Sequence, residues 1–254
     1  MNWDVGIAEL IAVMLGAVRA GAWMMLCPPF NSSLIPGPVK ALLSVGFALP
    51  MAPQLIATVP SIKTSDIIAS AILQVFIGAS LGFITQLLFS AVQAAGDLLD
   101  VFGGFTLAMA YDPLSQSQSS IFGRYYSLLA VTLLFASNGH QLILRGFLQT
   151  FHTLPLNASF SMGTFSDLLT KGIGEMFVSA LQIAGPLIAV LFLTDVAFGL
   201  LNRVAPALNA FQLGFPAKIF LVLSLAGTAI TILPRALSTI VNHAVSAVVH
   251  LSGG

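Results

Sequence analysis

The sequence predicts an all-α, polytopic membrane protein with about six long helices that prolines interrupt. Three observations carry this prediction. Of 254 residues, 57% are hydrophobic and only 7% are charged, and mean hydropathy is +0.97. Soluble domains carry about 25% charged residues, so lipid or partner subunits must cover most of this surface. The apolar runs also have the length of membrane crossings, which need about 20 residues each.

The first three apolar runs follow directly from the sequence. The first covers about residues 7–27, and the second, at about 39–59, carries Pro50 and Pro53 in its middle, where we expect a kink or a break. The third run has no charge over residues 67–96. It is longer than one perpendicular crossing needs, so it tilts or projects beyond the bilayer.

Polar stretches separate the remaining runs. We expect a central polar loop at about 97–123 and a second polar loop at about 145–171, with an apolar run at 125–144 between them. The later apolar runs are expected at three places: residues 176–201, 219–233 and, more weakly, 236–251. Together they make a single membrane domain over residues 1–254. Residues 1–4 have no basic segment, so we expect no cleaved signal peptide.

The composition also argues against several classes of function. Nine basic and nine acidic side chains give zero net charge, which argues against nucleic-acid binding. Cys27 is the single cysteine, so no internal disulfide can form. The four histidines lack zinc-site spacing, and no phosphate-binding glycine motif occurs. We therefore expect no metal, no cofactor and no enzymatic activity.

One hydrolase-like pattern has a simpler explanation. Residues 78–82, Gly-Ala-Ser-Leu-Gly, match the G-x-S-x-G nucleophile motif, but they lie inside an apolar run without the strand and turn that the motif needs. Gly78 and Gly82 also form G-x-x-x-G, which lets helix backbones approach closely. We therefore predict helix packing at this site rather than catalysis.

The segment 199–216 is the most informative part of the chain. It lies between two apolar runs and contains Pro206 and Pro216, each of which disfavours helix just before itself. A break at membrane depth is tolerated only where protein or a water-filled space satisfies the backbone. We expect a broken helix that serves assembly, with these candidate residues: Asn202, Arg203, Pro206, Asn209, Phe211, Gly214, Phe215 and Pro216.

Asp195 is the charged residue within the preceding apolar run. Gly199 and Asn202 follow it at i+4 and i+7 on the same helix face. A charge at membrane depth usually faces protein or water and has a partner. We interpret Asp195 as part of a buried ion pair or hydrogen bond that fixes subunit packing, with a proton or ion site as the alternative.

The central loop contains apolar side chains that a solvated loop would not carry. Its double glycine permits backbone angles that other residues avoid. Two interpretations stay open: ordinary packing on the same chain, or a loop that occludes a pore. The candidate plug residues are Phe102, Gly103, Gly104, Phe105, Leu107, Met109, Asp112 and Pro113.

Three blocks of the sequence resemble one known family. Residues 103–113 resemble its central Gly-Phe-Ala…Asp-Pro signature, and 134–155, with Asn-Gly-His at 138–140, resemble its Asn-Gly-His…Leu-Pro pattern. Residues 201–216 resemble its Arg-x-x-Pro-Gln-x-Asn-x-Phe-x-x-Gly-Phe-Pro signature, with Ala207 in place of the usual Gln. His152 also departs, since it stands near a usual Ser-Phe-Glu-like site. The family is that of the R-type flagellar biosynthesis proteins, FliR, of the bacterial type III export gate.

The resemblance implies a structural channel subunit of a helical, multi-subunit export gate, and not an enzyme. Its partners would be P-type and Q-type subunits, other membrane proteins of the export apparatus, and lipid. Unfolded rod, hook and filament subunits would pass through the channel across the bacterial inner membrane, at the flagellar basal body. The alternatives are the T-type subunit of virulence injectisomes, against which Gly214-Phe215-Pro216 argues, and a secondary transporter with broken helices.

Overall fold

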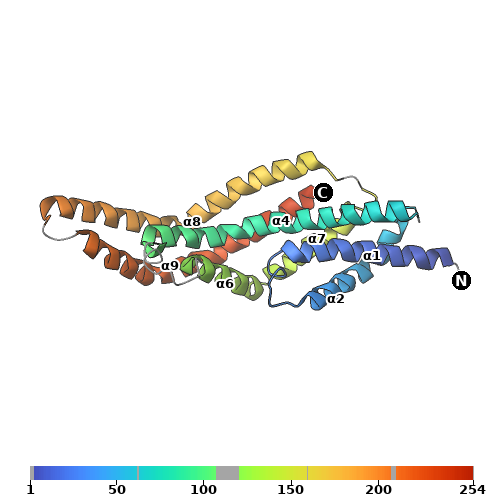
Figure 1. Ribbon diagram of the computed structural model, residues 1–254, viewed down its shortest axis with the longest axis horizontal. Coiled ribbons are helices and arrows are strands. Elements are labelled where there is room, and N and C mark those ends of the chain that lie inside the picture. Colours follow the sequence, from blue (N-terminus) through green and yellow to red (C-terminus); the bar gives the residue numbers. More distant parts are fainter. Residues whose placement is uncertain (1–2, 62, 107–119, 159, 207–209, 254) are drawn as a thin grey trace. The chain divides into compact units, whose positions relative to one another are not determined.

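The computed structural model describes residues 3–61, 63–106, 120–158, 160–206 and 210–253 (Figure 1). The described residues form helices and turns without any strand, which confirms the all-α prediction. Among them, five helices are long and apolar enough to cross a membrane, or six crossings if one bent pair counts as a single span. This agrees with the predicted number of about six.

The helices differ widely in length. In chain order they are α1 (Trp3–Leu26), α2 (Gly37–Ala48), η1 (Leu49–Met51), α3 (Ala52–Leu55), η2 (Ile56–Thr58), α4 (Thr64–Gly103), α6 (Ile121–Ala136), α7 (Gly139–Thr153), α8 (Met162–Val204) and α9 (Ala210–Leu251). The chain divides into two compact units. Unit 1 comprises residues 1–89, 137–173 and 241–254, and unit 2 comprises residues 90–136 and 174–240.

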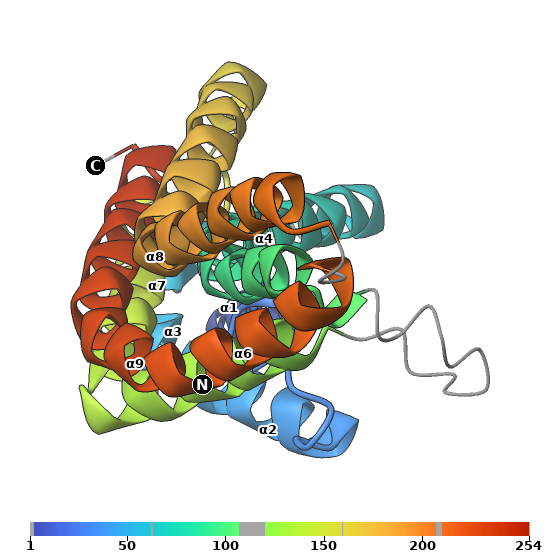
Figure 2. The same cartoon turned by 90° about the vertical axis from the view of Figure 1, so that its left-hand side faces the viewer.

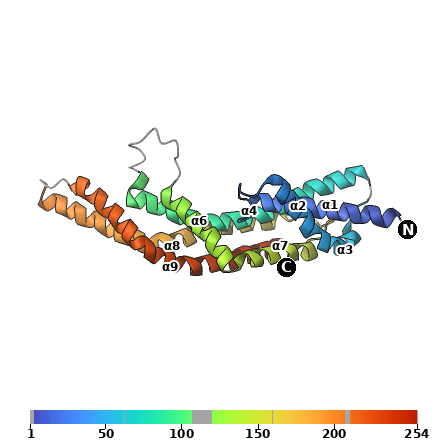
Figure 3. The ribbon, with the colours of Figure 1, turned by 90° about the horizontal axis from the view of Figure 1, so that it is seen from below.

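The second apolar run is distorted where its prolines lie. The α2 helix is followed closely by α3 (Figure 3), with Pro50 in the 3₁₀ helix η1 and Pro53 in α3. Proline lacks a backbone donor and clashes with the preceding turn, so the regular α-helical hydrogen bonds cannot continue through two prolines so closely spaced. The backbone nevertheless stays helical, and Gly37–Thr58 has the length of a single span. Of the predicted kink or break, the structure therefore shows a distorted helix and not a break.

The two predicted polar loops are shorter than expected. α4 continues through Asp97 to Gly103, and α6 begins at Ile121, before the predicted end of the central loop. Likewise α7 extends to Thr153 and α8 begins at Met162, so most of the predicted second loop is helical. The polar residues do not end these helices, because a helix can carry a polar side chain wherever that side chain finds a partner or an outward face.

The predicted single run at 125–144 is instead divided between two helices. α6 and α7 are separated by a turn at residues 137–138, where Asn138 has φ 58°. Asparagine is one of the few residues that adopt this left-handed conformation at small cost. The Asn-Gly-His block therefore marks the turn between α6 and α7.

The break in the 199–216 segment is confined to its centre. α8 ends and α9 begins on either side of Pro206, which lies outside both helices. Pro216, which the sequence also predicted to interrupt the helix, lies inside α9. The same helix continues through Pro234, so the two C-terminal runs predicted separately form one helix. Prolines are tolerated inside apolar helices where neighbouring groups satisfy the freed backbone.

Two glycines bring α4 against α1 within unit 1. A Cβ at Gly78 would overlap the carbonyl oxygen of Arg19, and a Cβ at Gly82 would lie 2.7 Å from that of Trp23. No side chain fits between the two helices at these points, so both positions require glycine. The prediction that residues 78–82 serve helix packing is confirmed.

Arg19 is fully buried at this crossing and connects three helices. Its Nε donates to Oε1 of Gln74 on α4 at 2.6 Å. Its Nη1 donates to the carbonyl oxygens of Thr150, at 3.2 Å, and Leu154, at 2.8 Å. These carbonyls lie at the C-terminal end of α7, which carries partial negative charge and favours a cation. Arg19 thus fixes the end of α7 to α1 and α4.

We predict that Arg19→Ala destabilises unit 1. The substitution removes the donor from Gln74 and from two carbonyl groups, and each buried polar group left unpaired costs roughly 1–3 kcal/mol. Arg19→Lys should recover only part of the loss, because an ammonium lacks the planar fork of donors. The measurement is the melting temperature of the detergent-solubilised protein. Arg235→Ala, at an exposed position of α9, is the control, and an equal loss there would contradict the prediction.

Candidate functional site

The double glycine lies where α4 ends and the chain turns. Gly103 is the last residue of α4, and Gly104 has φ +84° with its amide donating to the carbonyl of Val101 at 3.3 Å. Positive φ is open to glycine and costly for residues with a Cβ. We call these two residues the glycine corner.

Side chains from two other helices fill the space around the glycine corner, all within unit 2. A Cβ on its first residue would lie 2.9 Å from the side chain of Val222, and a Cβ on its second would lie 3.0 Å from the ring of Phe215. Both residues belong to α9. Phe105, directly after the corner, packs edge-to-face on Phe122 of α6, with ring centroids 5.2 Å apart. Helices α4, α6 and α9 therefore meet at the corner.

The structure describes four of the eight predicted plug residues. The glycine corner is buried, Phe105 is half-buried, and Phe102 is 37% exposed. The other predicted plug residues lie outside the described residues: Leu107, Met109, Asp112 and Pro113. What the structure shows is therefore the base of the candidate plug and its contacts.

Asp100 connects the end of α4 to the start of α6. Its side chain is 1% exposed, and its Oδ2 accepts hydrogen bonds from the amides of Phe122, at 2.9 Å, and Gly123, at 3.5 Å. It also accepts one from the hydroxyl of Ser120. The Ser120 oxygen in turn accepts from the amide of Gly123 at 2.8 Å, as an N-cap residue does. A carboxylate at a helix N-terminus is stabilised by the helix dipole.

Sequence reasoning missed the role of Asp100 because it placed this residue in the central polar loop and not in a helix. The available signal was Ser120, directly before the apolar residues of α6, since serine in that place marks a helix start. Nothing in the sequence indicated that a second cap would come from α4. Gly96 and Gly123 make this possible, because a Cβ at either would overlap atoms of the other helix.

Helices α8 and α9 run back along each other within unit 2 and bring Asp195 to Lys218. The two side chains form an ion pair and are 49% and 19% exposed, respectively. Nearer the break, the Phe198 ring lies 3.5 Å from the place of a Cβ on Gly214. Figure 2 views unit 2 from this end and shows the end of α4 between α8 and α9. Asp195 therefore has the partner that the sequence required, although the pair is partly open.

The other predicted assembly residues do not join this cluster. Asn202 and Arg203 are exposed at the end of α8. Asn209 lies outside the described residues, and of Phe211 only the helical backbone is described. Pro216 follows Phe215 inside α9. Of the predicted residues, the structure brings together the glycine corner with Phe215, and Gly214 with the helix that carries Asp195.

The described residues hold no group of three His, Cys, Asp or Glu side chains that could bind a metal ion. The chemistry of the site is instead that of packing and capping. An apolar segment follows the glycine corner, and contacts with side chains of α6 and α9 hold the corner in place. Such an arrangement can position a segment.

Comparison with known proteins assigns the chain to a protein family. The family profile described as "Bacterial export proteins, family 1" matches residues 10–244. The chain belongs to this family. It is 31% identical to the flagellar biosynthetic protein FliR of Bacillus subtilis, with 82% of each chain covered. It is 32% identical to FliR of Escherichia coli, over 82% of this chain and 80% of the relative, and 31% identical to FliR of Pectobacterium carotovorum, over 85% and 83%.

In this export protein, we predict that Gly104→Ala loosens the corner. Left-handed geometry costs a residue with a Cβ about 1–2 kcal/mol, and the new methyl would also press on Phe215. The melting temperature should fall, and a second change, Phe215→Leu, should restore part of the loss by giving room. Gly174→Ala is the matched control, since nothing lies within 4 Å of its Cβ position in α8. If Gly104→Ala and Gly174→Ala lowered the melting temperature equally, the proposed contact between the Gly104 position and Phe215 would be contradicted.

We also predict an asymmetry across the ion pair of the export protein. Asp195→Ala leaves the more buried Lys218 unpaired, whereas Lys218→Ala leaves a half-exposed carboxylate. The first change should therefore cost more, on the order of 1–3 kcal/mol. The double change Asp195→Leu and Lys218→Leu should be milder than Asp195→Ala, because no charge is left alone. Thermal unfolding of all three variants measures this, and equal losses in the two single variants would contradict it.

Proposed function

We propose that this export protein is a structural channel subunit of the flagellar type III protein export gate. The chain is a membrane protein of the flagellar export apparatus, where it works with other export proteins and is not an enzyme. The finer proposal is that unfolded rod, hook and filament subunits cross the inner membrane, at the flagellar basal body, through a channel that this chain helps to line. The observation that carries the proposal is the glycine corner, which gives an apolar segment a closely packed base.

The lengths of the main helices support a multi-subunit gate. α4, α8 and α9 contain 40, 43 and 42 residues, which at about 1.5 Å per residue makes each roughly 60 Å long. The hydrocarbon core of a bilayer is about 30 Å thick. Tilts of membrane helices reach about 40°, which still leaves such helices too long for the core. Part of each helix therefore has to extend beyond the hydrocarbon core.

The surface of α8 supports the same proposal. Large apolar side chains are exposed along most of its length: Phe177 (60%), Leu181 (55%), Phe192 (59%), Leu193 (64%) and Leu200 (61%). An apolar surface that extends beyond the bilayer core has to be covered by protein, because water would not tolerate it. P-type and Q-type export subunits are the partners that we propose for this face.

The segment that follows the glycine corner is proposed as the plug of the resting gate. A channel wide enough for an unfolded chain would also pass ions, so it needs a closure when no cargo is present. Phe105 packs on Phe122 at the base of this segment, and Leu107 and Met109 supply apolar bulk after it. Hydrophobic constrictions close pores by expelling water. Methionine suits this role because it is flexible and adapts its shape.

The flagellar assignment is favoured over the T-type subunit of virulence injectisomes. Gly214-Phe215-Pro216 is typical of the flagellar signature that the chain resembles. The relatives described above are also named as flagellar biosynthetic proteins. Both gates would pass unfolded protein, so the choice changes the cargo and not the mechanism.

We predict that deleting residues 105–111 leaves the gate assembled but permeable to ions. The complex should still co-purify with P-type and Q-type subunits, because the glycine corner and its α9 contacts remain. Ion conductance across the membrane should rise, as should sensitivity of growth to salt. The triple change Phe105→Ser, Leu107→Ser and Met109→Ser should act in the same direction without shortening the loop.

The matched control changes Ser115 and Ser117, in the same stretch of sequence, to alanine. These changes remove no apolar bulk, so conductance should stay at the parent level. An assembled deletion complex that is as tight to ions as the parent would show that the segment serves packing and not closure.

A further inference from the structure

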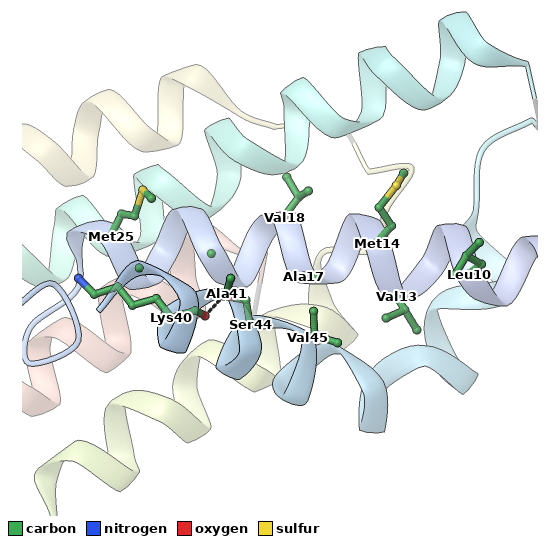
Figure 4. A pocket seen from close by; sticks show the side chains of 12 residues that line it. Leu10, Val13, Met14, Ala17, Val18, Met25, Lys40, Ala41, Ser44 and Val45 are labelled. Atoms are coloured by element: carbon green, nitrogen blue, oxygen red, sulfur yellow. Dashed lines mark hydrogen bonds between the residues drawn. The ribbon is translucent and has the colours of Figure 1, made fainter. Parts of the chain in front are cut away.

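A narrow apolar groove runs between α1 and α2 within unit 1 (Figure 4). Its volume is about 550 Å³, within the range of ligand pockets. Leu10 lies at one end and Met25 at the other, and each is 71% exposed, so the groove opens on the outside of the unit. Small residues form its floor, where a Cβ on Gly21 would lie 3.4 Å from the hydroxyl of Ser44.

Among the described residues that line the groove, Lys40 is the only charged one. It lies at the Met25 end, near the loop that joins α1 to α2 (Figure 4). Both helices are part of candidate membrane spans, so this end of the groove lies near a membrane surface. Lys40 forms no ion pair with any described residue. The groove thus combines a long apolar surface with an uncompensated cation at one end.

The length of the groove suits an extended hydrocarbon chain. From Leu10 to Met25 the groove follows about 22 Å of α1, which exceeds the roughly 15 Å of one leaflet. An acyl chain that lies along this length places its headgroup at the end where the Lys40 ammonium lies.

We propose that this groove is a binding site for an anionic phospholipid. One acyl chain lies along α1 and α2, and the phosphate is paired with the Lys40 ammonium. Charge complementarity selects the anionic headgroup, because each basic side chain near a membrane surface attracts anionic lipid. The groove shares no residue with the glycine corner, so the inference does not depend on the channel role.

The test uses the intact complex that the full-length chain forms, moved from mild detergent into nanodiscs with equal amounts of phosphatidylglycerol and phosphatidylcholine. Native mass spectrometry counts the lipids that stay bound. Phosphatidylglycerol should be retained over phosphatidylcholine. Lys40→Ala should weaken its retention about fivefold, whereas Lys40→Arg should keep it. Ala41→Phe, which fills the groove, should remove both lipids.

Lys63→Ala is the matched control, because Lys63 is an exposed cation outside the groove. It should leave lipid retention unchanged. Equal retention of the two lipids, or an equal effect of Lys40→Ala and Lys63→Ala, would overturn the proposal. A photo-reactive residue in place of Met14 gives a second measurement: an adduct with the mass of a phospholipid supports the site, and an adduct with the mass of a protein subunit overturns it.

Discussion

Charged groups inside apolar helices have no water to bind, and two buried ones in this chain bind the ends of other helices. Arg19 donates to the carbonyl groups at the C-terminal end of α7. Asp100 accepts from the amide groups at the N-terminal end of α6. In each case the sign of the charge opposes the partial charge of the helix end. Removing either side chain leaves several backbone groups unpaired. The Asp100 contact therefore fixes where α6 begins, and the Arg19 contact fixes where α7 ends.

The close approach of the helices is a condition for these contacts. Gln74, Gly78 and Gly82 follow one another at intervals of four residues and lie on one face of α4. The two glycines remove the side chains that would separate α4 from the backbone of α1. Gln74, one turn earlier on the same face, is thereby brought within 2.6 Å of Arg19. A pattern that resembles a catalytic motif therefore serves to place a buried arginine.

The sequence was sufficient for the helical class, the span number, the distortion at Pro50 and Pro53 and the break at Pro206, because these follow from local chemistry. It misplaced the loop boundaries, because it took polar stretches that contain charged residues such as Asp100 to be loops. It also placed a break at Pro216, which lies inside α9. In both cases the outcome depends on neighbours distant in sequence. A local sequence pattern cannot predict whether a carboxylate caps another helix. It also cannot predict whether neighbouring groups bind the carbonyl that a proline inside a helix leaves without a donor.

The turn between α8 and α9 sets which residues of the signature blocks can meet. A hairpin pairs positions that are about equally far from its turn, and Asp195 and Lys218 lie at nearly equal distances on either side of the break. The same register puts Phe215, one turn before Lys218, on the side of α9 that meets Gly104. Packing between α8 and α9 therefore decides where the Phe215 ring lies. Because Gly104 has no Cβ, the Phe215 ring fills the space beside it. The base of the apolar segment that follows Gly104 is therefore positioned by the packing of α8 against α9.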